Sequence, residues 1–272
     1  MSRDDFIRMP ARLQRTLNPR ESGAASAPRH GVARALSKLG ICSRSQAALW
    51  VHAGRVAVGG RITRNPETPV RAGYDRIEVD GVEVGERPRI YLLLNKPRGY
   101  VTSAADEQGR DTIYALLADR KLPWLAPVGR LDKASEGMLL LSNDSAWSAR
   151  ITAPDSQLDK TYHVQIDRLP DAALLAALRD GIEDRGERLA AKSVHELRRG
   201  DRNAWLEIVL DEGRNRQIRR LLAAFGIDVL RLVRVAIGSL VLGELAKGEW
   251  RTLAVPEVTA LAPTCAPSNP AQ

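Results

Sequence analysis

The sequence contains few cysteines and few aromatic residues, and it has no long apolar run. Its two cysteines, Cys42 and Cys265, stand far apart and match no metal-binding or redox spacing, which argues against a disulfide framework and against a metal site. No apolar run approaches the roughly 20 residues that a transmembrane helix requires. The first thirty residues also lack the apolar core of a secretory signal. We therefore expect a cytoplasmic protein with no membrane partner.

Basic residues exceed acidic ones. The chain has 41 Lys and Arg against 33 Asp and Glu, a formal charge of +8 over 272 residues. Phosphate contacts gain from Coulomb attraction and counterion release, so this charge favours a polyanionic partner. The length allows one large core and one smaller domain. We expect residues 1–30 to form a disordered basic arm and residues 263–272 to form a flexible tail.

Residues 31–87 are expected to form a compact module of two helices and a few short strands. Ser43 followed by Gln46 fits a capping box at the start of the second helix, and Gly54 is the expected stop. Alternation over residues 55–58 and 75–79 is typical of half-buried strands. The basic side chains of this module fit either a phosphate-binding face or a solvated helix face.

Two sequence runs in this module carry a family signature. They are residues 36–47 (LSKLGICSRSQA) and residues 54–60 (GRVAVGG). Together they closely resemble the S-four-like (alpha-L) RNA-binding module. The resemblance implies that the helix pair and its loops grip structured RNA. The candidate RNA-binding residues are Arg34, Lys38, Arg44 and Arg55.

Residues 88–262 are expected to form a second, larger domain. Strand-like runs at residues 90–94, 161–166 and 204–210 are separated by occasional helices, one of which Pro170 would start. Strands and helices do not alternate strictly. This pattern predicts an α+β fold with a mixed or antiparallel sheet and argues against a doubly wound nucleotide-binding fold.

Asp132 lies between two strand-like stretches, at residues 127–128 and 139–141, in a connection bracketed by Gly129 and Gly137. We expect it on a rigidly held turn, which is a common place for catalytic groups. The residues alone leave two interpretations open. Asp132 is either a turn-forming or ion-paired surface residue or a catalytic carboxylate.

A second basic cluster is expected on a helix over residues 213–222, ending at Gly226. In this helix Ile218 and Leu221 belong to the core stripe, while Arg216 and Arg220 point away from it. Arg219 lies on the flank of the stripe and would need an acidic partner if it were buried. Asp132 is one candidate for that partner, and a plain amphipathic surface helix is the alternative.

Six runs in the larger domain carry a second signature. They are NKPRGYVTS (95–103), GRLD (129–132), LLLSND (139–144), KTY (160–162), GRNRQIRR (213–220) and GEWRTL (248–253). In this order they resemble the RsuA and RluB branch of RNA pseudouridine synthases. The chain departs from the family pattern at Glu107, Ser135, Met138 and Ser145, and none of these changes removes a group that the chemistry needs.

This resemblance implies an enzyme that isomerises a uridine in ribosomal RNA to pseudouridine without metal or organic cofactor. It implies that Asp132 is the catalytic carboxylate, that Tyr162 lies against the target base and that Arg219 pairs with Asp132. Whether Asp132 acts as nucleophile or as base stays open. The further RNA contacts expected in this domain are Lys96, Arg98, Arg130, Arg214, Arg216 and Arg220.

Large-subunit (23S) RNA is the expected target, with small-subunit (16S) RNA as the nearest alternative, and the protein is expected to be a monomer. Two rival functions remain. One is an RNA-binding assembly factor without catalysis. The other is a glycoside hydrolase, which usually needs two acidic groups, whereas no second acid accompanies Asp132 in a comparable motif.

Overall fold

The structure is a computed structural model that describes residues 28–103, 109–118, 122–156 and 158–262. The predicted arm, apart from residues 28–30, and the predicted tail lie outside the described residues. The chain divides into two compact units, one containing residues 1–89 with the short segments 121–126 and 143–145, and the other containing the rest. Within the described ranges, no helix has both the length and the apolar character that a membrane crossing requires.

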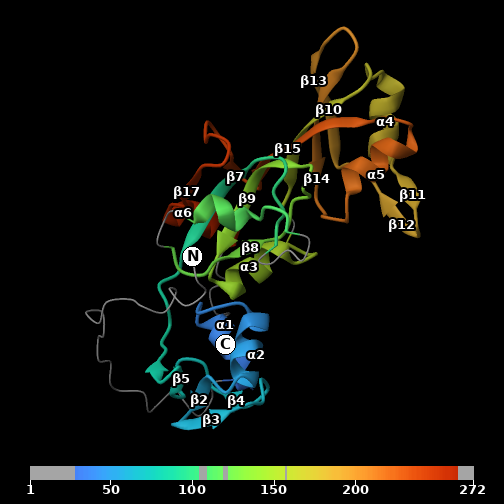
Figure 1. Ribbon diagram of the computed structural model, residues 1–272. Helices are drawn as coiled ribbons and strands as arrows, with labels where there is room; N and C mark the ends of the chain where they lie inside the picture. Colours follow the sequence, from blue (N-terminus) through green and yellow to red (C-terminus); the bar gives the residue numbers. More distant parts are fainter. Residues whose placement is uncertain (1–27, 104–108, 119–121, 157, 263–272) are drawn as a thin grey trace, which may run out of the picture. The chain divides into compact units, whose positions relative to one another are not determined.

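The first unit packs two short helices against small antiparallel sheets (Figure 1). Its elements are β1 (His30–Gly31), α1 (Val32–Lys38), α2 (Arg44–His52), β2 (Val56–Val58), β3 (Arg61–Thr63), β4 (Pro69–Val70), β5 (Ile77–Val79) and β6 (Val82–Glu83). The predicted cap of α2 is confirmed, since the Ser43 hydroxyl accepts a hydrogen bond from the amide of Gln46 at 3.0 Å. Leu36, Val51, Val56 and Ile77 are among the fully buried residues of the core that joins helices and sheet.

A nine-stranded mixed sheet forms the second unit. Seven strands follow the order β13-β14-β10-β15-β9-β7-β17, and β16 and β8 pair with β15 and β9 respectively. Only the β15–β9 pair is parallel among the pairs with a described register in this sheet. The strands are β7 (Tyr91–Lys96), β8 (Ala126–Val128), β9 (Glu136–Ser142), β10 (Lys160–Ile166), β13 (Ser193–Arg199), β14 (Ala204–Leu210), β15 (Val229–Ile237), β16 (Leu240–Val241) and β17 (Trp250–Thr252). The predicted α+β class with a mixed or antiparallel sheet is confirmed.

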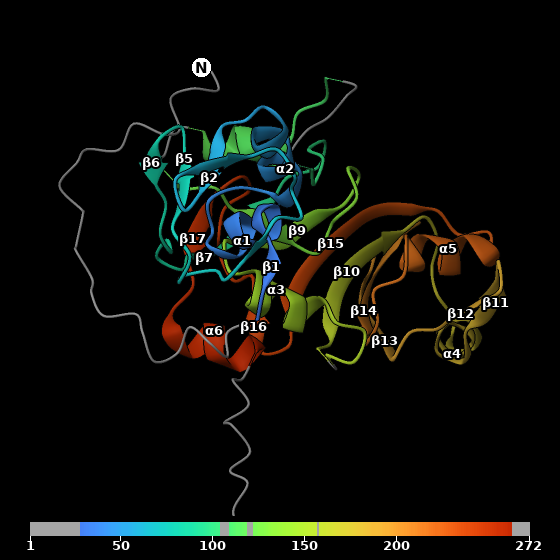
Figure 2. The same cartoon turned by 90° about the horizontal axis from the view of Figure 1, so that it is seen from below.

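Helices cover this sheet in two groups. Helices α4 (Ala172–Asp180) and α5 (Gln217–Ala224) pack on the part formed by β10, β14 and β15, where Figure 2 shows the strands running side by side. Helices α3 (Ser145–Thr152) and α6 (Val255–Leu261) contribute to a second core with β7 and β9. A 3-10 helix, η2 (Ile113–Leu117), and the hairpin of β11 (Ile182–Asp184) and β12 (Glu187–Leu189) complete the unit.

Two predicted helix starts are wrong. Pro170 precedes helix α4 instead of opening it, because Asp171 is the N-cap and its carboxylate accepts a hydrogen bond from the amide of Leu174 at 2.8 Å. Helix α5 begins at Gln217, whereas the sequence predicted a helix from Gly213. Arg216 has a left-handed backbone with φ of 49°, so the residues before Gln217 form a loop. This difference changes where the arginines of the loop point.

Candidate active site

The turn that carries Asp132 is held by other segments of the second unit. The hydroxyl of Thr102 donates to the carbonyl oxygen of Leu131 at 2.8 Å and accepts from the Leu131 amide at 3.3 Å. The amide of Gly99 donates to the carbonyl oxygen of Lys133 at 2.8 Å, and the amide of Ser135 donates to that of Asp132 at 3.0 Å. The turn joins β8 to β9, as predicted, and these bonds fix its backbone.

The buried ammonium of Lys96 binds the same turn. Its ammonium donates to the carbonyl oxygens of Asp132 at 3.2 Å, Ser135 at 2.8 Å and Pro97 at 3.1 Å. The residue has no exposed surface, and burial lowers the pKa of its amine to about 8. This corrects the prediction that Lys96 contacts the RNA backbone, because its three donors already serve the protein's own carbonyl groups.

Asp132 faces a pocket of about 590 Å³ within the second unit. Tyr162 from β10 and Arg219 from α5 line the same pocket, so the three predicted catalytic residues come together. Arg130, Arg214 and Arg216 line it as well. The carboxylate side chain of Asp132 is 34% exposed, which keeps it accessible to a substrate.

Asp132 pairs with Arg216, and not with Arg219 as the sequence predicted. Arg216 Nη1 lies 3.4 Å from Asp132 Oδ2. Arg219 donates instead to the carbonyl oxygen of Ala134 at 3.2 Å and to that of Val229 at 3.3 Å. The left-handed backbone of Arg216 explains this exchange, since it places the residue in the loop before α5. Arg219 therefore ties the Asp132 turn to α5 and β15.

Burial of the Arg219 guanidinium lowers its pKa, and the neighbouring charge of Arg216 lowers it further. Asp132 opposes this shift because an opposite charge favours the charged form. Arg98 also acts electrostatically on Arg219 and is itself exposed. The pocket thus holds one carboxylate close to several guanidinium groups.

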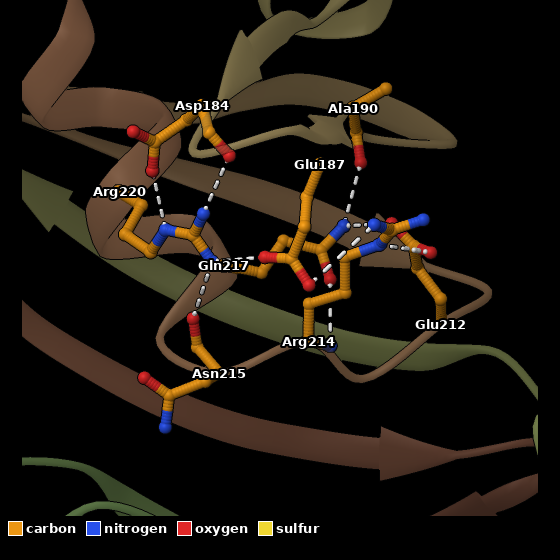
Figure 3. A network of polar contacts seen from close by, with 8 residues as sticks. All are labelled: Asp184, Glu187, Ala190, Glu212, Arg214, Asn215, Gln217 and Arg220. Atoms are coloured by element: carbon orange, nitrogen blue, oxygen red, sulfur yellow. Dashed lines mark hydrogen bonds and ion pairs between the residues drawn. The ribbon is translucent and has the colours of Figure 1, made fainter.

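A polar network holds the loop that precedes α5 (Figure 3). Arg220 Nη1 lies 2.7 Å from Glu187 Oε2, and its Nε lies 2.5 Å from Asp184 Oδ2. Arg214 Nε donates to Glu212 at 2.7 Å. Gln217 donates to Glu212 at 2.7 Å and to the carbonyl oxygen of Ala190 at 3.1 Å. The network fixes the loop from which Arg216 reaches Asp132.

The contacts in this network differ from the RNA contacts that the sequence predicted for Arg214 and Arg220. The side chain of Arg220 is only 14% exposed and is engaged by two carboxylates, so it does not point outward toward RNA. Arg214 is half-buried and bonded to Glu212, although it still lines the pocket. Arg130 is exposed at the pocket and makes no ion pair in the described part of the chain.

Sequence reasoning missed two cations of the pocket, Lys160 and Arg234. Arg234 is 6% exposed and stands directly opposite Tyr162 in the β10–β15 register. The signal was present in β15, where Leu232 is buried and the next residue on the same face, two positions later, is the arginine. Lys160 precedes Tyr162 by two residues and therefore shares its face of β10.

The predicted RNA-binding residues of the first unit are on the surface or partly buried. Arg34 is exposed, and Arg44 pairs with Glu67 at 3.1 Å while both side chains remain more than 60% exposed. Lys38 Nζ lies 2.8 Å from His30 Nε2. Arg55 pairs with Asp80 at 2.5 Å, and this pairing lowers the pKa of the Asp80 carboxyl. No group of three or more potential metal ligands occurs among the residues described.

Comparison with known proteins identifies both units. The family model described as RNA pseudouridylate synthase matches residues 90–224, and the S4 domain model matches residues 32–75. An uncharacterized RNA pseudouridine synthase of Aquifex aeolicus is 38% identical over 80% of this chain and 88% of its own length. The ribosomal large subunit pseudouridine synthase B of Bacillus subtilis is 33% identical over 84% of this chain and 93% of its own.

A solved structure agrees with these relatives. The crystal structure of a pseudouridylate synthase superposes with a TM-score of 0.58 at 32% identity, and it covers 85% of this chain and 99% of the other. The matches extend over both units in sequence order. The chain belongs to the RNA pseudouridylate synthase family, in its RsuA and RluB branch with an N-terminal S4 domain, and it is an RNA pseudouridine synthase of the isomerase class.

Proposed function

We propose that the protein converts a uridine of large-subunit ribosomal RNA to pseudouridine, with Asp132 as the catalytic carboxylate. The observation that carries the catalytic part is the convergence of Asp132, Tyr162 and Arg219 on one pocket. The target is supported by the 33% identity to the Bacillus subtilis enzyme, whose name specifies the large subunit. The S4 domain would anchor the RNA, with Arg34, Lys38, Arg44 and Arg55 as contacts.

The reaction moves uracil from one attachment to another on the same ribose. The bond between C1′ and N1 breaks, a bond between C1′ and C5 forms, C5 loses a proton and N1 gains one. Atoms balance without a second substrate. Asp132 serves either as the nucleophile that traps the detached fragment or as the base that starts elimination. Arg216 Nη1 lies 3.4 Å from Asp132 Oδ2, so this guanidinium would orient the carboxylate in either route.

The uridine must leave its base stack before it reaches Asp132. Extrusion costs a few kcal/mol and is cheapest in loops and single strands. Stacking on Tyr162 would return about 1–3 kcal/mol of this cost. Arg130, exposed at the pocket, is placed to enter the space that the base vacates or to bind the adjoining phosphate.

Ribosomal RNA from a strain that lacks the protein provides the test. We expect the wild-type protein to introduce pseudouridine into large-subunit RNA and the Asp132→Asn variant to introduce none. Both ribosomal RNAs should be mapped chemically in the same reaction. Modification confined to small-subunit RNA would correct the target, and binding without any modification would favour an assembly factor.

A further inference from the structure

Two cations in the pocket have no carboxylate partner in the described part of the chain. Arg234 makes one hydrogen bond there, from Nε to the carbonyl oxygen of Met138 at 2.8 Å. Its Nη2 atom is buried and has no hydrogen-bond partner among the described residues. The one hydrogen bond of the Lys160 ammonium within the described ranges goes to the backbone carbonyl oxygen of Asp211, at 3.5 Å. Arg234 is buried and Lys160 is partly buried. An unpaired buried charge is costly, so an anion bound at this pair would stabilise it.

Two neighbouring acids already have cationic partners, and the carboxylate of Asp211 forms no ion pair with Lys160 in the described part of the chain. Asp159, next to Lys160 in sequence, pairs with Lys192 at 2.7 Å. Glu212, on the pocket wall, pairs with Arg214 at 2.7 Å. Burial lowers the pKa of the Lys160 amine and the charge of Arg234 lowers it further, while the charges of Asp159 and Asp211 oppose this shift. The two cations therefore lie close enough to repel each other, which a shared anion would relieve.

The strand register places Lys160 and Arg234 beside Tyr162, on which the target base is proposed to stack. Arg234 is the Cα partner of Tyr162 across β10 and β15, and Lys160 is on the Tyr162 face two residues earlier. The backbone next to Arg234 is closely packed: a Cβ atom on Gly137, its partner on β9, would lie 2.3 Å from the Arg234 carbonyl oxygen. The strand that presents Arg234 is thus fixed from both sides.

We propose that Lys160 and Arg234 form a phosphate site inside the catalytic pocket, which binds a backbone phosphate adjoining the uridine that stacks on Tyr162. A phosphate joined to the ribose of that uridine brings the missing anion to the pair. A guanidinium and an ammonium together suit its several acceptor oxygens. This inference rests on the proposed function, because it takes Tyr162 as the platform for the base.

The salt dependence of RNA binding tests the phosphate site directly. Each phosphate contact contributes about 0.7 to the slope of log K against log salt for single-stranded RNA. For ribosomal RNA we expect the Arg234→Gln and Lys160→Gln variants each to lower the slope magnitude by about 0.7 and to slow single-turnover modification about tenfold or more. The Arg234→Lys variant keeps the charge and should keep the slope. A purely structural part for Arg234 would change stability and leave the slope intact.

A double variant and a charge-matched control sharpen the result. Because both cations would bind one phosphate, the Lys160→Gln, Arg234→Gln double variant should lose no more slope than either single variant. Arg179→Gln removes an exposed charge on α4, outside the pocket, and should leave slope and rate unchanged. If Arg234→Gln does not fold, Lys160→Gln carries the same prediction.

Unchanged slopes in the Lys160 and Arg234 variants would overturn the phosphate site. Additive loss in the double variant would overturn the shared phosphate. Wild-type protein that binds ribosomal RNA but never modifies it would instead overturn the proposed function. The slope is measured from binding alone, so the two failures remain distinguishable.

Discussion

The buried amine of Lys96 should make the unfolding free energy of the protein depend on pH. The residue has no exposed surface, and its pKa falls from 10.5 to about 8 in the folded protein because burial disfavours the ammonium form. Between pH 8 and 10.5 the unfolded chain keeps this proton while the folded chain releases it. The unfolded state therefore binds more protons in this window, and the contribution of Lys96 to stability rises with pH.

The size of this rise follows from the two pKa values. A difference of one in pKa corresponds to about 1.4 kcal/mol. The contribution should therefore grow by about 3 kcal/mol between pH 8 and 10.5 and stay constant below pH 8. The Lys96→Met variant has no titrating group at this position. Its unfolding free energy should fall progressively behind that of the wild type across the same window.

Urea unfolding of wild type and Lys96→Met at several pH values measures this difference. Lys133 is on the same turn and is exposed, so Lys133→Met serves as the matched control. The control should follow the wild-type pH profile. Parallel profiles for wild type and Lys96→Met would refute the argument that the amine is buried and titrates near pH 8.

Three further changes test the parts that surround the pocket. Gly137→Ala should destabilise the fold by about 3 kcal/mol or more in urea unfolding, because φ is 98° and the new Cβ would lie 2.3 Å from the backbone of Arg234. Gly129→Ala has a strained backbone but free space around the new Cβ, so it should cost about 1 kcal/mol. Equal costs for the two variants would contradict the close contact at Gly137. Arg220→Gln should lower the unfolding free energy by about 1–3 kcal/mol in the same measurement, since Asp184 and Glu187 lose their partner. Unchanged stability would show that these ion pairs do not stabilise the fold. Arg216→Gln should change the unfolding free energy by less than about 1 kcal/mol, because the ion pair of Arg216 with Asp132 is half-exposed. The same variant should slow single-turnover modification about tenfold. An unchanged rate would show that Arg216 does not assist Asp132 in the reaction.

The sequence identified the residues that line the pocket better than it predicted the contacts between them. Asp132 could be placed on a turn because Gly129 and Gly137 bracket it and strand-like runs flank it. The phase of helix α5 identified Ile218 and Leu221 as buried, which the structure confirms. Periodicity applies only within a helix, however, and it could not describe Arg216, which lies before the first helical residue.

Buried cations were the other failure of sequence reasoning. Lys96 is the last residue of β7 and precedes Pro97, so its position in the sequence is equally typical of a solvated turn. Nothing local indicates that three carbonyl groups converge on its ammonium. Arg234 was recognisable in principle, because it occupies an inward position in the alternation of β15. Its neighbours Tyr162 and Gly137 come from strands far away in sequence, and only the sheet order brings them together.

The most direct test of the account is to measure pseudouridine formation with wild type, Asp132→Asn and Asp201→Asn. Asp201 is an exposed aspartate in the turn between β13 and β14, so its variant controls for the loss of one carboxylate. The substrate is ribosomal RNA from a strain that lacks the protein, mapped chemically after a single turnover. The account predicts one new pseudouridine in large-subunit RNA with wild type and Asp201→Asn, and none with Asp132→Asn. Pseudouridine formed by Asp132→Asn at the wild-type rate would contradict it.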